Sequence, residues 1–277
     1  MMENKIKYEN AREYIKEKFN DIKFIEESHQ YFIDDVEYTP VSNIIKEYEV
    51  YVNWDIKAGE YADKHGLIKE NVQKDWRLNN LKSTITGTKI HEFGESYTNL
   101  LIGHPELICE SNKRQYIEEY NTLVPTHHKE ESIIKFYDEL NDGVFKYIPI
   151  GAEFRLSTRY MKNSRPICGT CDLLFWKEDK LFPDDSGYIV MDWKTNSKLY
   201  NDYNRKFGVN MQPPFQNMVD ENLSHYTLQF NMYQRMLESI GIDIKDRVLI
   251  WLKDDGYETI QIPKIDDSVL DKVFNKL

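Results

Sequence analysis

Three residues in the second half of the chain have side chains suited to phosphate chemistry. Asp172 precedes Asp192 and Lys194, and both acidic residues stand in stretches whose composition predicts β-strands. Asp192 and Lys194 are two positions apart, so their side chains share one face of a strand. If the two strands are neighbours, both carboxylates can converge on one hard cation. The spacing therefore predicts a site for Mg²⁺ or Mn²⁺.

A cation held in this way suits the hydrolysis of a phosphodiester. Mg²⁺ takes oxygen ligands and keeps several waters, which a phosphate can replace. A lysine beside the cation can orient the attacking water or help to deprotonate it, and it balances charge in the transition state. The chain has no Gly-x-Ser-x-Gly motif, which disfavours a small-molecule hydrolase of the serine type.

Hydrophobic periodicity predicts the elements that must position these residues. Strands are expected at 144–158, 167–176 and 188–195, with a last hairpin at 247–253 and 258–262. Helices are expected at 10–20, over most of 55–80, and at 86–101, 223–240 and 267–275, with a polar loop at 196–222.

This order of elements predicts an α/β (α+β) fold with a central mixed sheet flanked by helices. A helical N-terminal part, residues 1–82, should carry a small β-hairpin that turns at Asp34 and Asp35. Residues 83–277 should form the core, and the two parts together should make one compact unit.

The predicted helix at 86–101 has a marked buried face. Apolar residues at spacings of three and four run from Ile90 to Leu101, and Gly103 should end the helix. His91 and Glu95 are one turn apart, so their side chains share a face beside that apolar stripe.

Four short segments give the chain a specific resemblance. Residues 169–172 (Gly-Thr-Cys-Asp) and 189–195 (Ile-Val-Met-Asp-Trp-Lys-Thr) resemble the active-site hairpin of the PD-(D/E)xK nucleases. Residues 87–91 (Gly-Thr-Lys-Ile-His) and 229–233 (Gln-Phe-Asn-Met-Tyr) resemble two helices of the RecB-like branch of that superfamily. All four occur in the family's order, and the hairpin at 22–45 is similar to phage-encoded members. The resemblance implies a restriction-endonuclease-like core.

The resemblance also implies a set of metal ligands. Asp172 and Asp192 would be the acidic ligands, and the main-chain carbonyl of Trp193 would add an oxygen. His91 would add a nitrogen. Glu153 matches an acidic position that is common in the family, and it would lie near the metal.

Other matching residues would act on the substrate. Lys194 would act on the water and the scissile phosphate, while Gln229 and Tyr233 would steady the nucleic-acid strand or the lysine. Plainer interpretations remain open: His91 as a packed helix residue, Glu153 as an ion-pair partner, and Gln229 with Tyr233 as ordinary helix positions.

The cysteines limit the cofactors. Family members with an iron–sulfur cluster carry four cysteines, whereas this chain has three, Cys109, Cys168 and Cys171. We therefore expect no such cluster, and we expect Cys168 and Cys171 to be buried thiols.

The net charge of -11 argues against a protein that coats nucleic acid, because counterion release favours basic surfaces. Local charge differs from the total. Residues 154–171 hold four basic residues and no acidic one, and 193–211 hold four against one, with aromatic residues interleaved in the second stretch. Basic and aromatic residues together suit a single strand or a frayed end, although a solvated basic loop is the alternative. The residues expected to contact the strand, besides Gln229 and Tyr233, are Arg155, Arg159, Lys198, Arg205 and Lys206.

These observations predict a metal-dependent deoxyribonuclease, an exonuclease of phage or prokaryotic type acting in recombination, repair or processing of DNA. The alternatives are a structure-specific or restriction-like endonuclease and, in another class, a non-catalytic DNA-binding protein on a nuclease fold. Its partner would be a DNA strand or duplex end, with a homo-oligomer or a recombination protein as further partners. A cytoplasmic protein without a membrane span is expected, because the chain lacks an apolar run of about 18 residues and an apolar leader.

Overall fold

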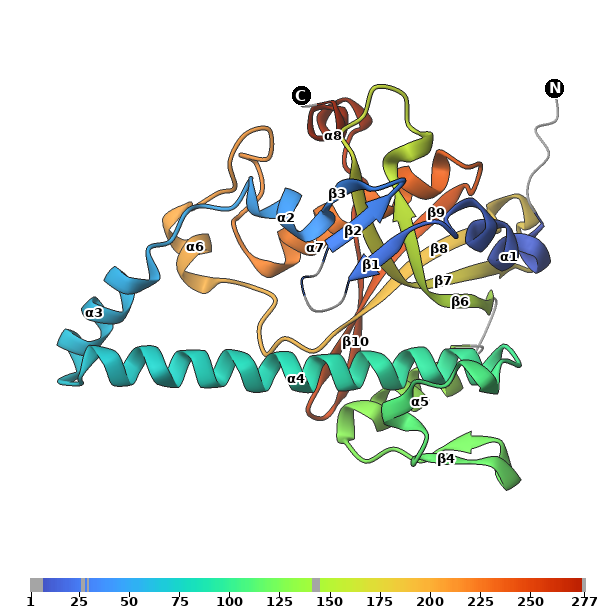
Figure 1. The fold of residues 1–277 in the computed structure, drawn as a ribbon, viewed down its shortest axis with the longest axis horizontal. Coiled ribbons are helices and arrows are strands. Elements are labelled where there is room, and N and C mark those ends of the chain that lie inside the picture. Colours follow the sequence, from blue (N-terminus) through green and yellow to red (C-terminus); the bar gives the residue numbers. More distant parts are fainter. Residues whose placement is uncertain (1–6, 26–27, 29, 141–144, 276–277) are drawn as a thin grey trace.

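The computed structural model describes residues 7–25, 28, 30–140 and 145–275. Within these ranges the chain is a mixed α/β structure with a large mixed sheet flanked by helices, as predicted (Figure 1). The strands of the large sheet are β1 (Lys23–Ile25), β2 (Gln30–Ile33), β3 (Val36–Pro40), β6 (Phe145–Ser157), β7 (Ile167–Asp179), β8 (Gly187–Lys194), β9 (Ile244–Lys253) and β10 (Gly256–Gln261). A small separate sheet pairs β4 (Tyr116–Ile117) with β5 (Thr122–Leu123).

Of the eight α-helices in the described ranges, those nearest the predicted segments 10–20, 223–240 and 267–275 agree well with prediction. The eight helices are α1 (Tyr8–Lys18), α2 (Val41–Lys46), α3 (Trp54–His65), α4 (Lys69–Leu101), α5 (His128–Glu139), α6 (Asp202–Phe207), α7 (Asn222–Glu238) and α8 (Asp267–Phe274). The expectation of a loop throughout 196–222 was wrong, because α6 forms within it, capped by the Asn201 side chain. None of the helices in the described ranges combines the length and the apolar character needed to cross a membrane.

The middle of the large sheet carries the predicted site. β7 pairs antiparallel with β6 and with β8, and β9 pairs in parallel with β8. The first residues of β7 also pair in parallel with β3, so the N-terminal hairpin belongs to the same sheet. The proposed boundary between residues 82 and 83 falls inside α4, and the sheet joins strands from both sides of it.

The N-terminal hairpin turns where the sequence predicts. Asp34 and Asp35 have φ values of 50° and 62°, the left-handed region that tight hairpin turns require and that aspartate tolerates. β3 then ends at Pro40 and α2 begins at Val41.

The largest difference from prediction is the length of α4. It is one helix of 33 residues rather than two helical segments that meet near residue 85. Its middle part, residues 77–86, is exposed on all sides. Apolar residues at spacings of three and four, Leu78, Leu81 and Ile85, continue the helical pattern there but remain exposed to solvent. α4 ends before Gly103, whose φ of 84° fits the predicted stop.

The buried face of α4 also differs in its last turn. Leu101 is 49% exposed, whereas Leu100 is buried. The buried positions there follow Phe93, Ser96 and Leu100, which keeps the helical spacing but ends one residue earlier than predicted.

Two apolar cores cover the two faces of the sheet. One lies between the sheet and α1, α2, α7 and α8, and it includes Val190 and Leu249. The other lies between the sheet and the helices α4 and α5, and it includes Trp193. The predicted burial of Cys168 and Cys171 is confirmed, and both thiols are free.

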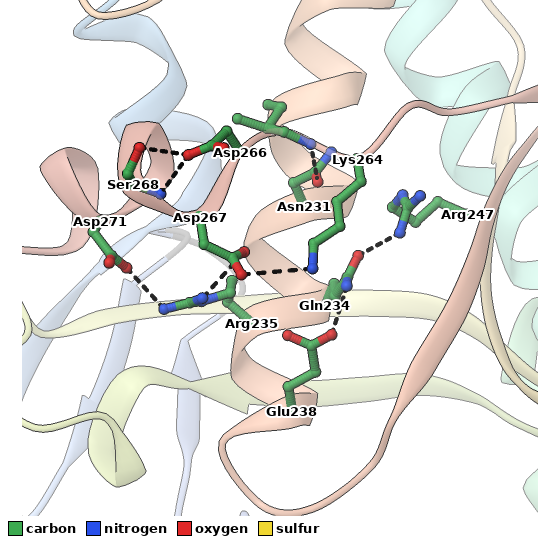
Figure 2. Close-up of polar contacts among 11 residues, drawn as sticks. Asn231, Gln234, Arg235, Glu238, Arg247, Lys264, Asp266, Asp267, Ser268 and Asp271 are labelled. Carbon is green, nitrogen blue, oxygen red and sulfur yellow. Dashed lines mark hydrogen bonds and ion pairs between the residues drawn. The ribbon is translucent and has the colours of Figure 1, made fainter.

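A polar network fixes the C-terminal half of α7 against its surroundings (Figure 2). The buried guanidinium of Arg247 in β9 donates to Gln234 Oε1 at 2.5 Å and to the carbonyl of Ile262 at 3.1 Å. Asn231 accepts from the main-chain N–H of Ile265 at 2.8 Å. These contacts hold α7 in place, and α7 also faces the predicted site.

Candidate metal centre

Three carboxylate residues lie at one level of the sheet on three neighbouring strands. The pairing of β7 with β8 ends one residue short of Asp172 and Asp192, which are therefore opposite each other at the next position. In β6, Ala152 pairs with Leu173 and Phe154 pairs with Cys171, so Glu153 lies opposite Asp172. Like charges placed opposite each other across strands repel, so this row requires a proton or a cation to balance it.

α4 brings an imidazole to the row. His91 Nδ1 lies 2.9 Å from Asp172 Oδ2, and ligand atoms of His91, Glu153 and Asp172 all lie within 4.8 Å of one another. One turn earlier, Gly87 lies beside Thr195, and a Cβ there would lie 3.4 Å from Thr195 Oγ1, close to an ordinary van der Waals contact. The structure thus brings together His91, Glu153 and Asp172 from three separate elements.

Asp192 and Lys194 share one face of β8, as predicted. Lys194 Nζ lies 2.5 Å from Asp192 Oδ2, and the two side chains are 11% and 3% exposed. Burial by itself lowers the pKa of Lys194, but the charges of Asp192 and Asp172 raise the pKa above its usual value. The lysine therefore carries its proton at neutral pH.

The acidic residues of the row have unequal pKa values. Burial and the charge of Asp172 raise the pKa of Asp192 well above its usual value. Burial also tends to raise the pKa of Asp172, but His91 and Lys194 lower it. Asp172 is therefore the more acidic of the two aspartates.

Glu153 adds a third acid in an unusual backbone conformation. Its φ of 54° is left-handed in the middle of a strand, a conformation that costs free energy and that packing must enforce. Burial and the charge of Asp172 raise the pKa of Glu153 well above its usual value. The conformation places Glu153 with His91 and Asp172 at the expense of local strain.

The donor set fits a hard divalent cation. Both carboxylate oxygens of Asp192 and Oδ2 of Asp172 are buried, and the two carboxyl groups lie within hydrogen-bonding reach of each other. Their charged neighbours are Lys194 and His91. Carboxylate oxygens are the ligands that Mg²⁺ and Mn²⁺ prefer.

Trp193 contributes through its backbone at most, because its indole lies on the other face. The ring is 1% exposed and packs edge-on against Phe136 at 5.1 Å between centroids. Only the main chain of Trp193 lies at the level of Asp192 and Lys194.

α7 forms the wall behind the carboxylates. The ammonium of Lys194 lies over the ring of Tyr226 at 4.6 Å, and the Tyr226 hydroxyl donates to Asn196 Oδ1 at 2.6 Å. Tyr226 is a site residue that the sequence interpretation missed. The sequence feature that could have indicated Tyr226 is its position on α7, one turn before Gln229.

The predicted pair Gln229 and Tyr233 lies on the same helix. Gln229 Nε2 donates to the Tyr233 hydroxyl at 3.1 Å. Tyr233 is 5% exposed, and its ring packs so closely on Gly169 that a Cβ there would lie 2.7 Å from it. Tyr233 therefore supports β7 next to Asp172, while Gln229 remains half-buried.

Glu95 extends the acidic group along α4. It accepts from Cys109 Sγ at 3.2 Å, and burial raises its pKa above the usual value. Glu95, Glu153 and Arg155 line a cavity of about 560 Å³ next to the row. The one-turn spacing from His91 is the sequence signal for this position.

The predicted basic residues occupy different settings. Arg159 pairs with Asp21, and Arg205 donates to both oxygens of Glu221 at 2.8 and 2.7 Å. Arg155 is exposed beside the cavity, and Lys198 and Lys206 are exposed in and near α6. Arg159 and Arg205 are therefore paired with carboxylates. Arg155 donates to the carbonyl of Ile22 at 3.4 Å and lies over the ring of Phe24, and Lys206 lies over the ring of Phe207.

In comparisons with known proteins, no family model and no curated protein matches this chain.

Proposed function

We propose that this protein is a metal-dependent nuclease that hydrolyses phosphodiester bonds in DNA. The supporting observation is the row of Glu153, Asp172 and Asp192 across three strands, with Lys194 beside it. On this proposal the large sheet is the restriction-endonuclease-like core of a PD-(D/E)xK enzyme of the RecB-like type.

Asp172, Asp192, His91 and Glu153 would hold Mg²⁺ or Mn²⁺, with the carbonyl of Trp193 as a further ligand. When bound, the cation would polarise the scissile phosphate and lower the pKa of a water. It would also neutralise the mutual repulsion of the carboxylates, which otherwise forces a proton onto the row.

Lys194 would act as a fixed positive charge. Because its pKa is raised and it is held by Asp192 and Tyr226, it is protonated and poorly suited to accept a proton. It would instead orient the attacking water and stabilise charge on the phosphate, a contribution of about 10²–10³ in rate for one well-placed donor.

An exonuclease is the favoured activity, and a role in phage or prokaryotic recombination, repair or processing follows from the resemblance of the motifs. The cavity beside Glu153 and Glu95 supports an end-directed enzyme, because it offers room for a terminal nucleotide next to the carboxylates. An endonuclease would need no such terminal pocket.

The test is digestion of end-labelled linear DNA with Mg²⁺ or Mn²⁺. Asp192→Asn should abolish digestion, and Lys194→Ala should slow it by about 10²–10³-fold. Asp184→Asn and Lys180→Ala change exposed residues outside the site and are matched controls that should digest like the wild type.

Two outcomes would redirect the proposal. Cleavage of covalently closed circular DNA would replace the exonuclease with an endonuclease. Tight binding with no metal-dependent cleavage of any nucleic acid would favour a DNA-binding protein on a nuclease fold.

A further inference from the structure

A second surface pocket lies far from the sheet, on an arm formed by α3 and the first half of α4. This arm, residues 54–86, extends beyond the sheet at one end of the molecule (Figure 1). Its pocket has a volume of about 560 Å³. The lining residues are Trp54, Asp55, Gln73, Trp76, Arg77 and Asn80.

The pocket presents aromatic rings to solvent. Trp54 is 67% exposed, and its ring meets that of Trp76 edge-on at 6.2 Å between centroids. The ring of Tyr61 also meets that of Trp76 edge-on, at 5.7 Å between centroids, and Tyr61 is 43% exposed. Exposed rings held by neighbouring rings form a firm platform on which another flat group can stack.

The charge of the pocket is suited to an anion. Its one acidic residue, Asp55, pairs with Lys69 at 2.8 Å and accepts from Gln73 at 2.9 Å. Arg77 is exposed and has no ion-pair partner within the described ranges. A polyanion therefore meets an unpaired guanidinium and a neutralised carboxylate.

One face of α4 connects this pocket to the candidate metal centre. At 100° per residue, Gln73, Arg77, Asn80, Thr84 and Thr88 all lie within about 60° of His91 around the helix axis. Residues 76–91 contain no acidic side chain, and 77–86 are exposed. The rise of an α-helix puts Trp76 about 22 Å from His91 along the axis.

We propose that a single strand of DNA lies along this face of α4, with unpaired bases stacked on Trp54 and phosphates near Arg77. The strand would run past Thr84 and Thr88 to His91, so this inference rests on the proposed nuclease function. At the ~3.4 Å spacing of nucleotides in a stacked strand, the path accommodates about six nucleotides. A single strand is preferred to a duplex because base pairing would hide the faces that stack on an indole.

The experiment measures binding and catalysis separately. Binding of fluorescently labelled oligothymidylate to the full chain is followed by anisotropy in EDTA, where no hydrolysis occurs. Trp54→Ala should weaken binding about 5- to 150-fold, the range for loss of one stacked base, and Trp54→Phe should restore most of it. Arg77→Ala should reduce the slope of log K against log salt by about 0.7, the value for one lost contact on a single strand.

Controls on the same protein separate this inference from the proposed function. Lys82 lies on the opposite side of α4 from His91 and is exposed, so Lys82→Ala should leave binding and its salt slope unchanged. Tyr120, 68% exposed on a different surface, is the aromatic control. Hydrolysis of bis(p-nitrophenyl) phosphate depends on the metal centre alone and should be unchanged in Trp54→Ala and Arg77→Ala.

Several results would overturn the inference. The first is that both Trp54→Ala and Arg77→Ala bind the oligonucleotide as tightly as the wild type. The second is that a duplex binds equally well and depends on Trp54 to the same extent. The third is that the protein self-associates in sedimentation and that this association depends on Trp54. Absence of hydrolysis with Trp54-dependent strand binding would instead refute the proposed nuclease function and leave the path on α4 supported.

Discussion

Gly94 of α4 lies directly against the indole of Trp193 in β8. A Cβ at position 94 would lie 2.6 Å from Trp193 Nε1, a distance that no side chain tolerates without movement. Trp193 separates Asp192 from Lys194, and Gly94 follows His91 by one turn. The absence of a side chain at Gly94 therefore sets how closely the helix with the imidazole approaches the strand with the acid and the lysine.

Gly94→Ala should destabilise the protein by up to about 2 kcal/mol. Overpacking costs about 1–3 kcal/mol, and the better helix propensity of alanine returns about 1 kcal/mol. Activity should fall as well, because His91 moves with the helix. Chemical denaturation measures the first effect. Gly59→Ala is the control, since a Cβ there meets only Lys69 Cδ at 3.9 Å, and it should be neutral or stabilising.

Arg247 and Arg235 offer a matched pair on the polar network of α7 (Figure 2). Arg247→Ala should cost about 1–3 kcal/mol, because it leaves the buried Gln234 and the carbonyl of Ile262 without their donor. Arg235→Ala removes partly exposed ion pairs with Asp267 and Asp271 and should cost less than about 1 kcal/mol. Equal losses in urea denaturation would contradict this assignment.

Divalent cations should stabilise the folded protein through the carboxylate row. Mn²⁺ at a hundredfold excess over Kd should add about 2.7 kcal/mol, seen as a rise in Tm. Asp172→Asn should abolish the rise, because it removes a ligand at the centre of the row. Asp184→Asn should keep it, and an equal rise in both variants would place the cation elsewhere.

Glu153 should make the stability of the metal-free protein depend on pH. Its pKa in the folded state is raised above the usual 4.5, so the folded state holds a proton that the unfolded state releases. Stability is therefore greatest below the unfolded pKa and falls as pH rises toward the folded pKa. In EDTA, Glu153→Gln should raise the denaturation midpoint near neutral pH and leave it unchanged below about pH 4. If Glu153→Gln stabilised the protein only at acidic pH, the pKa of Glu153 would be lowered by folding, and the prediction would be wrong.

The parts of the site that depend on local geometry were predictable. Asp192 and Lys194 share a face because side chains alternate in a strand, and this holds in any sheet. The proximity of Asp172 followed from a short connection between two predicted strands. His91 and Glu95 share a face because they are one helical turn apart.

Other parts depend on tertiary packing and leave no local signal. The left-handed φ of Glu153 cannot be predicted from a residue type that rarely adopts it. The middle of α4 carries Leu78, Leu81 and Ile85 at helical spacing, but they are exposed and face no core. The sequence interpretation therefore ended one helix near residue 80 and began another at 86. Arg159 pairs with Asp21, which is distant in the sequence, and Arg205 pairs with Glu221, which lies in an irregular segment. The composition of a basic stretch alone therefore did not show which of its charges are paired with carboxylates.

Because α4 is one continuous helix, it fixes both the distance along the axis and the rotation around the axis between Trp76 and His91. Inserting a single residue in the exposed stretch between them would lengthen the helix by only about 1.5 Å, but it would rotate the side chain of Trp76 about 100° relative to that of His91. Inserting seven residues would restore their alignment to within about 20° and add about 10 Å. The phase of this helix, more than its length, therefore determines whether the arm and the carboxylate row can act on the same molecule.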